Sequence, residues 1–106
     1  MGITNFRVTP RTLQRRIHEA AKSSSVVLFI PQPNKEVLAG MMTYQQAMAC
    51  LRKGNIVGKP ELNAHGDWEL QMERFAANYL YKLRAAVTCS GAHVTRIYVF
   101  LTEENV

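Results

Sequence analysis

Alternating apolar and polar residues mark the C-terminal half of the chain, as they do in half-buried β-strands. The pattern is clearest in YLYKLRAAV at residues 79–87 and in HVTRIYVFL at residues 93–101. DWELQMERFA at residues 67–76 alternates too, and IVGKPELN at residues 56–63 predicts a weaker strand whose glycine and proline mark an edge or a bulge. Short connections containing Gly, Ala and Asn separate these segments, so we expect antiparallel hairpins.

Helical spacing dominates the first half of the chain instead. Thr9 suits the N-cap position and Pro10 the first turn of a helix that runs to about Lys22. Apolar residues recur in this segment at every third or fourth position, and arginines occupy the other faces. Residues 43–53 predict a second helix, which ends at Gly54.

A continuous apolar segment, SVVLFI at residues 25–30, follows the first helix and predicts a buried strand that two prolines end. NKEVLAGMM at residues 34–42 predicts a short turn or helix. The resulting order of elements is α-β-α-β-β-β-β. We therefore expect one α+β domain over residues 1–106, with the helices packed on one face of an antiparallel sheet.

The alternation assigns each strand residue to one of the two faces of that sheet. The side chains expected to pack on the helices are Trp68, Leu70, Leu83, Val87, Thr95, Ile97 and Val99. The opposite face should gather Glu69, Gln71, Glu73, Phe75, Lys82, Arg84, Val94, Arg96, Tyr98 and Phe100. Arg74 falls on the helix side, near the end of its strand.

Charge favours a polyanionic partner for this chain of 106 residues. Lys and Arg number 13 against 8 Asp and Glu, which gives a net charge of +5. Aromatic side chains among cations suit stacking on bases with phosphates neutralised nearby, so nucleic acid is the expected ligand. The candidate nucleic-acid-binding residues are Gln71, Arg74, Lys82, Arg84, Arg96 and Phe100.

Several other classes of function lack their sequence signatures. The two cysteines and three histidines are scattered without metal-ligand spacing, so neither a metal nor a cofactor is expected. No apolar run approaches a membrane span, and we expect a cytoplasmic protein without membrane contact. A small-molecule enzyme is the weakest reading, since no phosphate-binding glycine loop, carboxylate pair or nucleophile elbow is present.

Four short motifs, AMACLRKGNIV, DWELQMERF, YLYKLRAAV and RIYVFLTEE, follow one another over about residues 44–103. In that order they resemble the RelE superfamily of toxin–antitoxin ribonucleases, and within it the MqsR-like branch and related small toxin-like domains. The resemblance implies a RelE-like fold and a metal-independent endoribonuclease toxin. It also implies single-stranded RNA or mRNA as substrate and an antitoxin protein as partner.

Such ribonucleases cleave RNA by attack of a 2′-OH on the adjacent phosphate, which needs a proton acceptor, a proton donor and cations. The resemblance places these roles on Lys82, Arg84, His93, Arg96 and Tyr98. The terminal LTEENV lacks the lysine that MqsR-like members carry near their C-terminus.

Two alternatives remain beside the ribonuclease. In the first, the same face belongs to a non-catalytic module that binds nucleic acid or protein. In the second, the face is only solvated, and Glu69 and Glu73 form ion pairs with the cations across strands. A proton acceptor that faces the cations is the feature that favours the nuclease.

Overall fold

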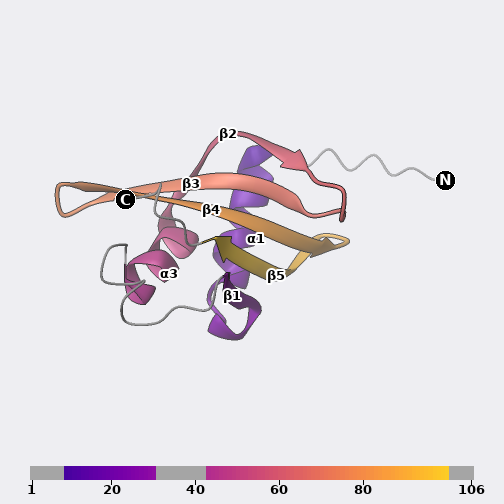
Figure 1. Cartoon of the computed structure of the whole chain (residues 1–106), viewed down its shortest axis with the longest axis horizontal. Coiled ribbons are helices and arrows are strands. Elements are labelled where there is room, and N and C mark those ends of the chain that lie inside the picture. The colour runs from indigo at the N-terminus through magenta and orange to yellow at the C-terminus, as the bar shows by residue number, and fades with distance from the viewer. Residues whose placement is uncertain (1–8, 31–42, 101–106) are drawn as a thin grey trace.

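The computed structural model describes residues 9–30 and 43–100, and the segment predicted at 34–42 lies outside them. Within these residues the chain forms two α-helices, a short 3-10 helix and one five-stranded mixed sheet (Figure 1). The elements are α1 (Pro10–Ala20), η1 (Ser24–Val26), β1 (Val27–Ile30), α3 (Tyr44–Lys53), β2 (Asn55–Leu62), β3 (Trp68–Ala76), β4 (Tyr79–Ser90) and β5 (His93–Phe100). The α+β class predicted from the sequence is confirmed, with boundaries close to those expected.

Side-chain caps start both α-helices where the sequence predicts them. The Thr9 hydroxyl accepts a hydrogen bond from the Thr12 backbone N–H at 3.1 Å. Thr43 forms a reciprocal capping box with Gln46, in which each side chain accepts from the backbone N–H of the other residue. Each cap satisfies N–H groups that the first helical turn leaves without a partner, which fixes where the helix begins.

The sheet has the strand order β1-β5-β4-β3-β2. Strands β2 to β5 form the predicted antiparallel meander, but β1 pairs in parallel with β5. The expectation of a wholly antiparallel sheet is therefore wrong at β1. Its uninterrupted apolar run is the pattern typical of parallel strands, and it was a signal of this pairing.

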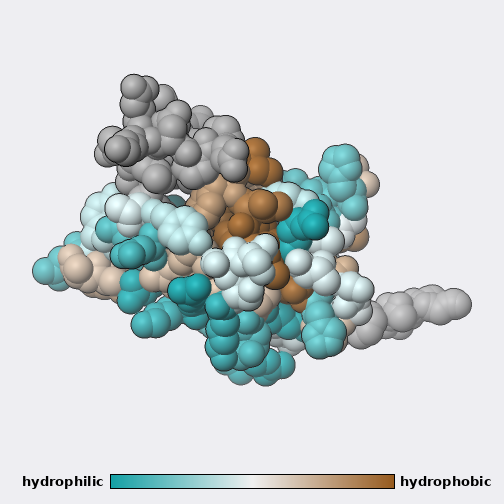
Figure 2. All heavy atoms as spheres, turned by 90° about the horizontal axis from the view of Figure 1, so that it is seen from below, coloured by the Kyte–Doolittle hydropathy of each residue, from teal (hydrophilic) through white to brown (hydrophobic). Residues whose placement is uncertain are grey.

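Strand β1 forms one edge of the sheet and exposes apolar side chains there. Leu28 is 44% exposed and Ile30 42% exposed, so the prediction of a buried strand is wrong for these two residues. They lie on the face of the sheet that neither α1 nor α3 covers. Figure 2 views the molecule from the side on which β1 lies and shows an apolar patch at its centre.

Helices α1 and α3 pack on one face of the sheet and form the core with it (Figure 1). The largest fully buried side chains are Leu13, Ile17, Met48, Leu51, Met72, Ile97, Val87 and Val99. Leu70 and Leu83 are buried on the same face, and Trp68 packs half-buried at its margin. The predicted inward set is thus confirmed in β3 and β4. We call the opposite face of the sheet, which neither α1 nor α3 covers, the free face.

A β-bulge changes the expected alternation at the start of β5. Thr88 pairs with Arg96, whereas its neighbour Cys89 pairs with Val94, so Thr95 is the extra residue. Val94 consequently turns into the core and is only 8% exposed, while Thr95 is exposed. The prediction that Val94 faces outward and Thr95 inward is wrong, because a bulge shifts the alternation by one residue.

The β3–β4 hairpin extends beyond the helices and ends in a strained two-residue turn (Figure 1). Ala77 and Asn78 have φ angles of 53° and 61°, as in a type I′ turn. Asn tolerates that conformation, but Ala pays a steric cost there because of its Cβ.

Replacing Ala77 with glycine should therefore raise the free energy of unfolding by about 0.5–1 kcal/mol, because glycine removes that cost. Urea denaturation measures the change. Ala92→Gly is the matched control, since Ala92 lies in the β4–β5 turn without a positive φ and should not gain stability. Equal gains from both substitutions would contradict the assignment of strain to Ala77.

Candidate nucleic-acid interface

Two rows of side chains cross the free face from β1 to β2, because residues paired across neighbouring strands point the same way. The first row is Ile30, Phe100, Arg84, Gln71 and Val57. The second row is Leu28, Tyr98, Ala86, Glu69 and Glu61. Both rows are apolar at β1, aromatic on β5 and polar on β3. The free face is therefore apolar at β1 and polar on β3, and on β2 it carries the apolar Val57 in the first row and the charged Glu61 in the second.

Arginines flank the two aromatic side chains of β5. Phe100 pairs directly with Arg84, and the Arg96 guanidinium donates a hydrogen bond to the Tyr98 hydroxyl at 3.3 Å. That hydrogen bond raises the pKa of Arg96 above its usual value, and an arginine side chain is charged at any physiological pH. Tyr98 and Phe100 are each half-buried, which leaves part of each ring open to a ligand.

Carboxylates face the cations from β3. Glu73 pairs with Lys82, and Glu69 pairs with Ala86 beside Arg84. A 3.0 Å hydrogen bond from the Asn63 side-chain amide holds the Glu69 carboxylate. Within residues 9–30 and 43–100 the one ion pair shorter than 4.0 Å is Lys22–Glu19, on α1. The cross-strand ion pairs considered for Glu69 and Glu73 are therefore not formed, and a proton acceptor does face the cations.

Ala86 separates Glu69 from Tyr98 on this face. Its methyl group is only 4% exposed, whereas its neighbours along β4, Lys82 and Arg84, are exposed. Because one strand lies between them, the backbones of Glu69 and Tyr98 are about 10 Å apart. A carboxylate and a phenol thus stand on either side of a small residue, with Arg84 in the adjacent row.

Most of the site residues predicted from the sequence lie on the free face, namely Gln71, Lys82, Arg84, Arg96, Tyr98 and Phe100. His93 lies apart from them at the start of β5, beside Arg15 and Arg16 of α1. Tyr98 follows it by five positions, which is about 16 Å along a strand. The structure therefore does not bring His93 to the aromatic and arginine side chains.

Arg74 also lies apart, on the helix side of β3. It pairs with Tyr81, whose hydroxyl accepts a hydrogen bond from Gln46 of α3 at 3.1 Å. Burial raises the pKa of the Cys50 thiol to about 12, and the positive charge of Arg74 opposes that rise. Arg74 is thus a neighbour of the core thiol and not of the free face.

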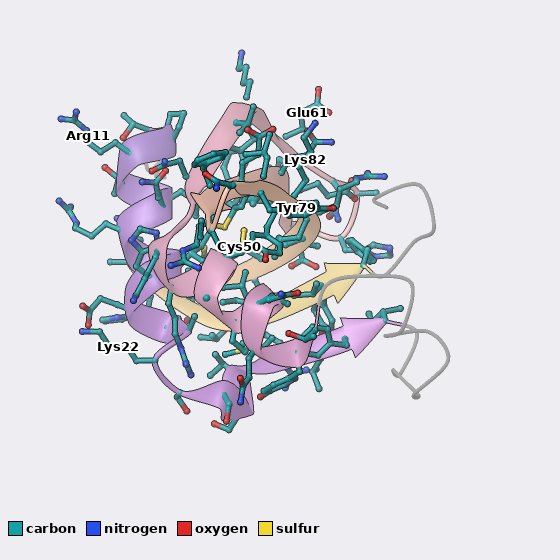
Figure 3. All side chains as sticks on the ribbon, turned by 90° about the vertical axis from the view of Figure 1, so that its left-hand side faces the viewer. Arg11, Lys22, Cys50, Glu61, Tyr79 and Lys82 are labelled. Carbon is teal, nitrogen blue, oxygen red and sulfur yellow. The ribbon has the colours of Figure 1, made fainter. Side chains whose placement is uncertain are left out.

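Net positive charge is concentrated on the helices, a feature that the strand pattern did not reveal. The free-face cations Lys82, Arg84 and Arg96 are accompanied by four carboxylates, Glu61, Asp67, Glu69 and Glu73. By contrast, α1, the turn after it and α3 carry Arg11, Arg15, Arg16, Lys22, Arg52 and Lys53 against the single carboxylate of Glu19. Figure 3 shows Arg11 and Lys22 projecting outward there. The arginine spacing in residues 10–20 was the available signal.

In the described part of the chain, no group of three or more His, Cys, Asp or Glu side chains is placed to hold a metal ion. Neither of the α-helices described above is long and apolar enough to cross a membrane. Comparison with protein-family models, curated proteins and solved structures found no match to this chain. Function must therefore be inferred from the residues themselves.

Proposed function

We propose that the free face binds single-stranded RNA. The observation that carries this proposal is the placement of Tyr98 and Phe100 beside Arg84 and Arg96 on one open surface. Aromatic rings on a sheet stack on unpaired bases, and neighbouring arginines neutralise the phosphates between them. Tyr98 and Phe100 are two residues apart, about 7 Å along β5, which suits two successive bases.

RNA is favoured over DNA by the polar half of the same face. Gln71 lies directly beside Arg84, and Glu69 occupies the next row. Both side chains offer oxygen atoms that accept a hydrogen bond from a ribose 2′-OH, the group that distinguishes RNA from DNA. A strand bound along β5 would present its riboses toward these oxygens.

Cleavage of the bound RNA without a metal ion is a second candidate, and the position of Glu69 favours it. In this proposal the Glu69 carboxylate accepts the 2′-OH proton, and the 2′-oxygen attacks the adjacent phosphorus. The Arg84 guanidinium stabilises the developing charge, and Tyr98 donates a proton to the departing 5′-oxygen. The products are a 2′,3′-cyclic phosphate and a 5′-hydroxyl end.

This cleavage would make the protein an endoribonuclease toxin, as the resemblance to the RelE superfamily implies. An antitoxin protein would then be its partner. A chain that binds RNA through the same face without cleaving it would instead be a binding module.

Binding can be tested by reversing one charge. Arg84→Glu should weaken binding to a single-stranded oligoribonucleotide about tenfold or more and reduce the salt dependence of the affinity, because a phosphate contact is lost. Fluorescence anisotropy at several salt concentrations measures both quantities. Lys53→Glu, at the end of α3 on the other side of the molecule, is the matched control. If both variants lost the same affinity, the free face would not be the binding surface.

A further inference from the structure

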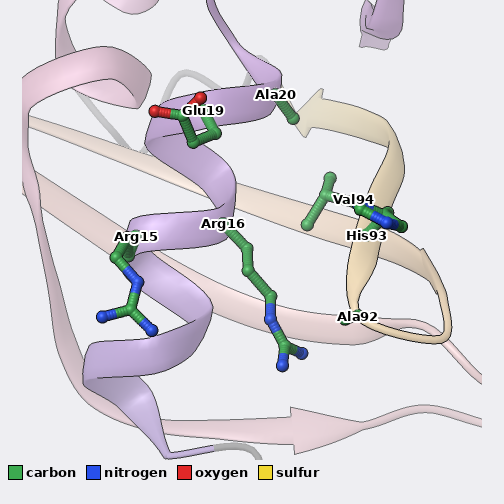
Figure 4. A pocket seen from close by; sticks show the side chains of 7 residues that line it. All are labelled: Arg15, Arg16, Glu19, Ala20, Ala92, His93 and Val94. Carbon is green, nitrogen blue, oxygen red and sulfur yellow. The ribbon is translucent and has the colours of Figure 1, made fainter.

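A pocket separates α1 from the β4–β5 turn. It has a volume of about 420 Å³ and is lined by Arg15, Arg16, Glu19, Ala20, Ala92, His93 and Val94. Figure 4 shows the Arg16 side chain extending from α1 into the space beside Ala92, with the His93 ring at the opposite margin. We call it the α1–β5 pocket. Its volume lies within the range of about 300–1,000 Å³ that is usual for small-molecule sites.

Small and inward-turned residues create this space. Ala20 on the helix and Ala92 in the turn have side chains too short to fill the gap. The β5 bulge turns Val94 toward the core, where it is 8% exposed and forms an apolar floor. The pocket therefore results from how α1 and the start of β5 pack against the core.

Positive charge dominates the pocket. Neither Arg15 nor Arg16 has a carboxylate within 4.0 Å among the described residues. Glu19 also lines the pocket, but its carboxylate oxygen accepts from the Lys22 ammonium at 2.9 Å, so Lys22 already neutralises it. Arg16 is half-buried, so its charge is less screened by water than that of a fully exposed side chain.

We propose that the α1–β5 pocket binds the phosphate group of a ligand of nucleotide size. A guanidinium group such as that of Arg16 donates paired hydrogen bonds to phosphate oxygens, and Arg15 adds a second positive charge at the margin of the pocket. The apolar walls would cover the rest of the ligand. That ligand is either the phosphorylated end of a nucleic acid or a free nucleotide. The pocket lies beside α1 and away from the free face, so this proposal does not depend on RNA binding by the free face.

Titration of the ¹⁵N-labelled protein with adenosine 5′-monophosphate tests this proposal. The backbone amide signals of Gly91, Ala92 and His93 should shift and saturate, whereas chloride at the same ionic strength should not produce saturation. Arg16→Gln should weaken binding about tenfold or more, since a charge-assisted hydrogen bond is lost. Arg11→Gln removes the same charge five residues earlier on α1, outside the pocket, and should bind as the wild type does.

A second set of measurements keeps the test informative if Arg16→Gln is poorly folded. Arg16→Lys retains the charge but loses the paired hydrogen bonds, so binding should be weakened to a smaller extent. Oligoribonucleotides with a 5′-phosphate, a 3′-phosphate or neither then identify the source of the phosphate. Tighter binding of one phosphorylated end indicates nucleic acid, and equal binding of all three with retained nucleotide affinity indicates a free nucleotide.

Two results would overturn the proposal. One is a linear, unsaturable response to the nucleotide that chloride reproduces, and the other is unchanged affinity in both Arg16 variants. Failure of RNA binding in Arg84→Glu, by contrast, concerns the free face alone, so the outcomes for the two surfaces are distinguishable.

Discussion

Glu69→Gln should slow the cleavage of single-stranded RNA about a hundredfold or more while leaving RNA binding largely intact. Glutamine has nearly the same shape but cannot accept the 2′-OH proton, and loss of a general base commonly costs a factor of this size. The Asn63 amide, which holds the Glu69 carboxylate at 3.0 Å, can still donate to the glutamine oxygen. Cleavage is measured by gel electrophoresis with freshly purified protein in the presence of EDTA.

Neighbouring residues supply the controls for this measurement. Glu73→Gln should have little effect, because Glu73 lies opposite Lys82 and away from the row that contains Tyr98. Tyr98→Phe should be as slow as Glu69→Gln if the phenol donates the second proton, whereas His93→Ala should cleave normally, since His93 lies beside α1.

The substrate provides a further check. RNA with methylated 2′-oxygens should resist cleavage while still binding to the protein. RNA that stays intact with the wild type, under conditions where it binds, would exclude the nuclease and leave the binding module.

Gly54→Ala should lower the free energy of unfolding by about 2–3 kcal/mol, as overpacking of a tight site does. The added Cβ would lie 2.5 Å from the Cys50 carbonyl oxygen and 2.8 Å from the Glu73 carbonyl oxygen. Both are backbone atoms, so no side-chain rotation relieves the contact. The Gly54 carbonyl also lies 2.7 Å from the His18 ring Nε2, which ties the same residue to α1.

Gly58→Ala is the control for that substitution. Gly58 has a φ of 76° but open space around the position of a Cβ, so its replacement should cost only about 1 kcal/mol. Urea denaturation of both variants separates crowding from backbone strain. A loss at Gly54 no larger than at Gly58 would contradict the close approach of α3 and β3.

Local signals made much of the fold predictable from the sequence. Thr9 and Thr43 cap the helices where expected because a cap depends on residues only three positions apart. The alternation in β3 and β4 correctly assigned Leu70 and Leu83 to the core, since side-chain direction in a strand repeats every second residue.

Features that depend on distant parts of the chain were harder to predict. The apolar pattern of residues 27–30 is typical of a parallel strand, but it does not identify β5 as the partner of that strand. The bulge at Thr95 is likewise set by pairing with β4, and a simple alternation therefore misplaced Val94.

The candidate site could be predicted only in part, because some of its features also depend on distant parts of the chain. Arg84, Arg96 and Tyr98 share the free face because regular alternation holds in the parts of β4 and β5 that carry them. The proximity of Arg16 to the β4–β5 turn depends on how α1 packs on the sheet, which no local pattern reports. Glu69 was expected as an ion-pair partner, and only the strand register shows it opposite Ala86.

The parallel pairing of β1 with β5 also constrains how the chain folds during synthesis. Val27 pairs with Ile97, about 70 residues later, so β1 leaves the ribosome long before its partner exists. The antiparallel meander of β2 to β5 has short connections and can form first. Until β5 is complete, the apolar side chains of β1 have no strand to pair with, so this segment is exposed to non-native contacts for most of synthesis.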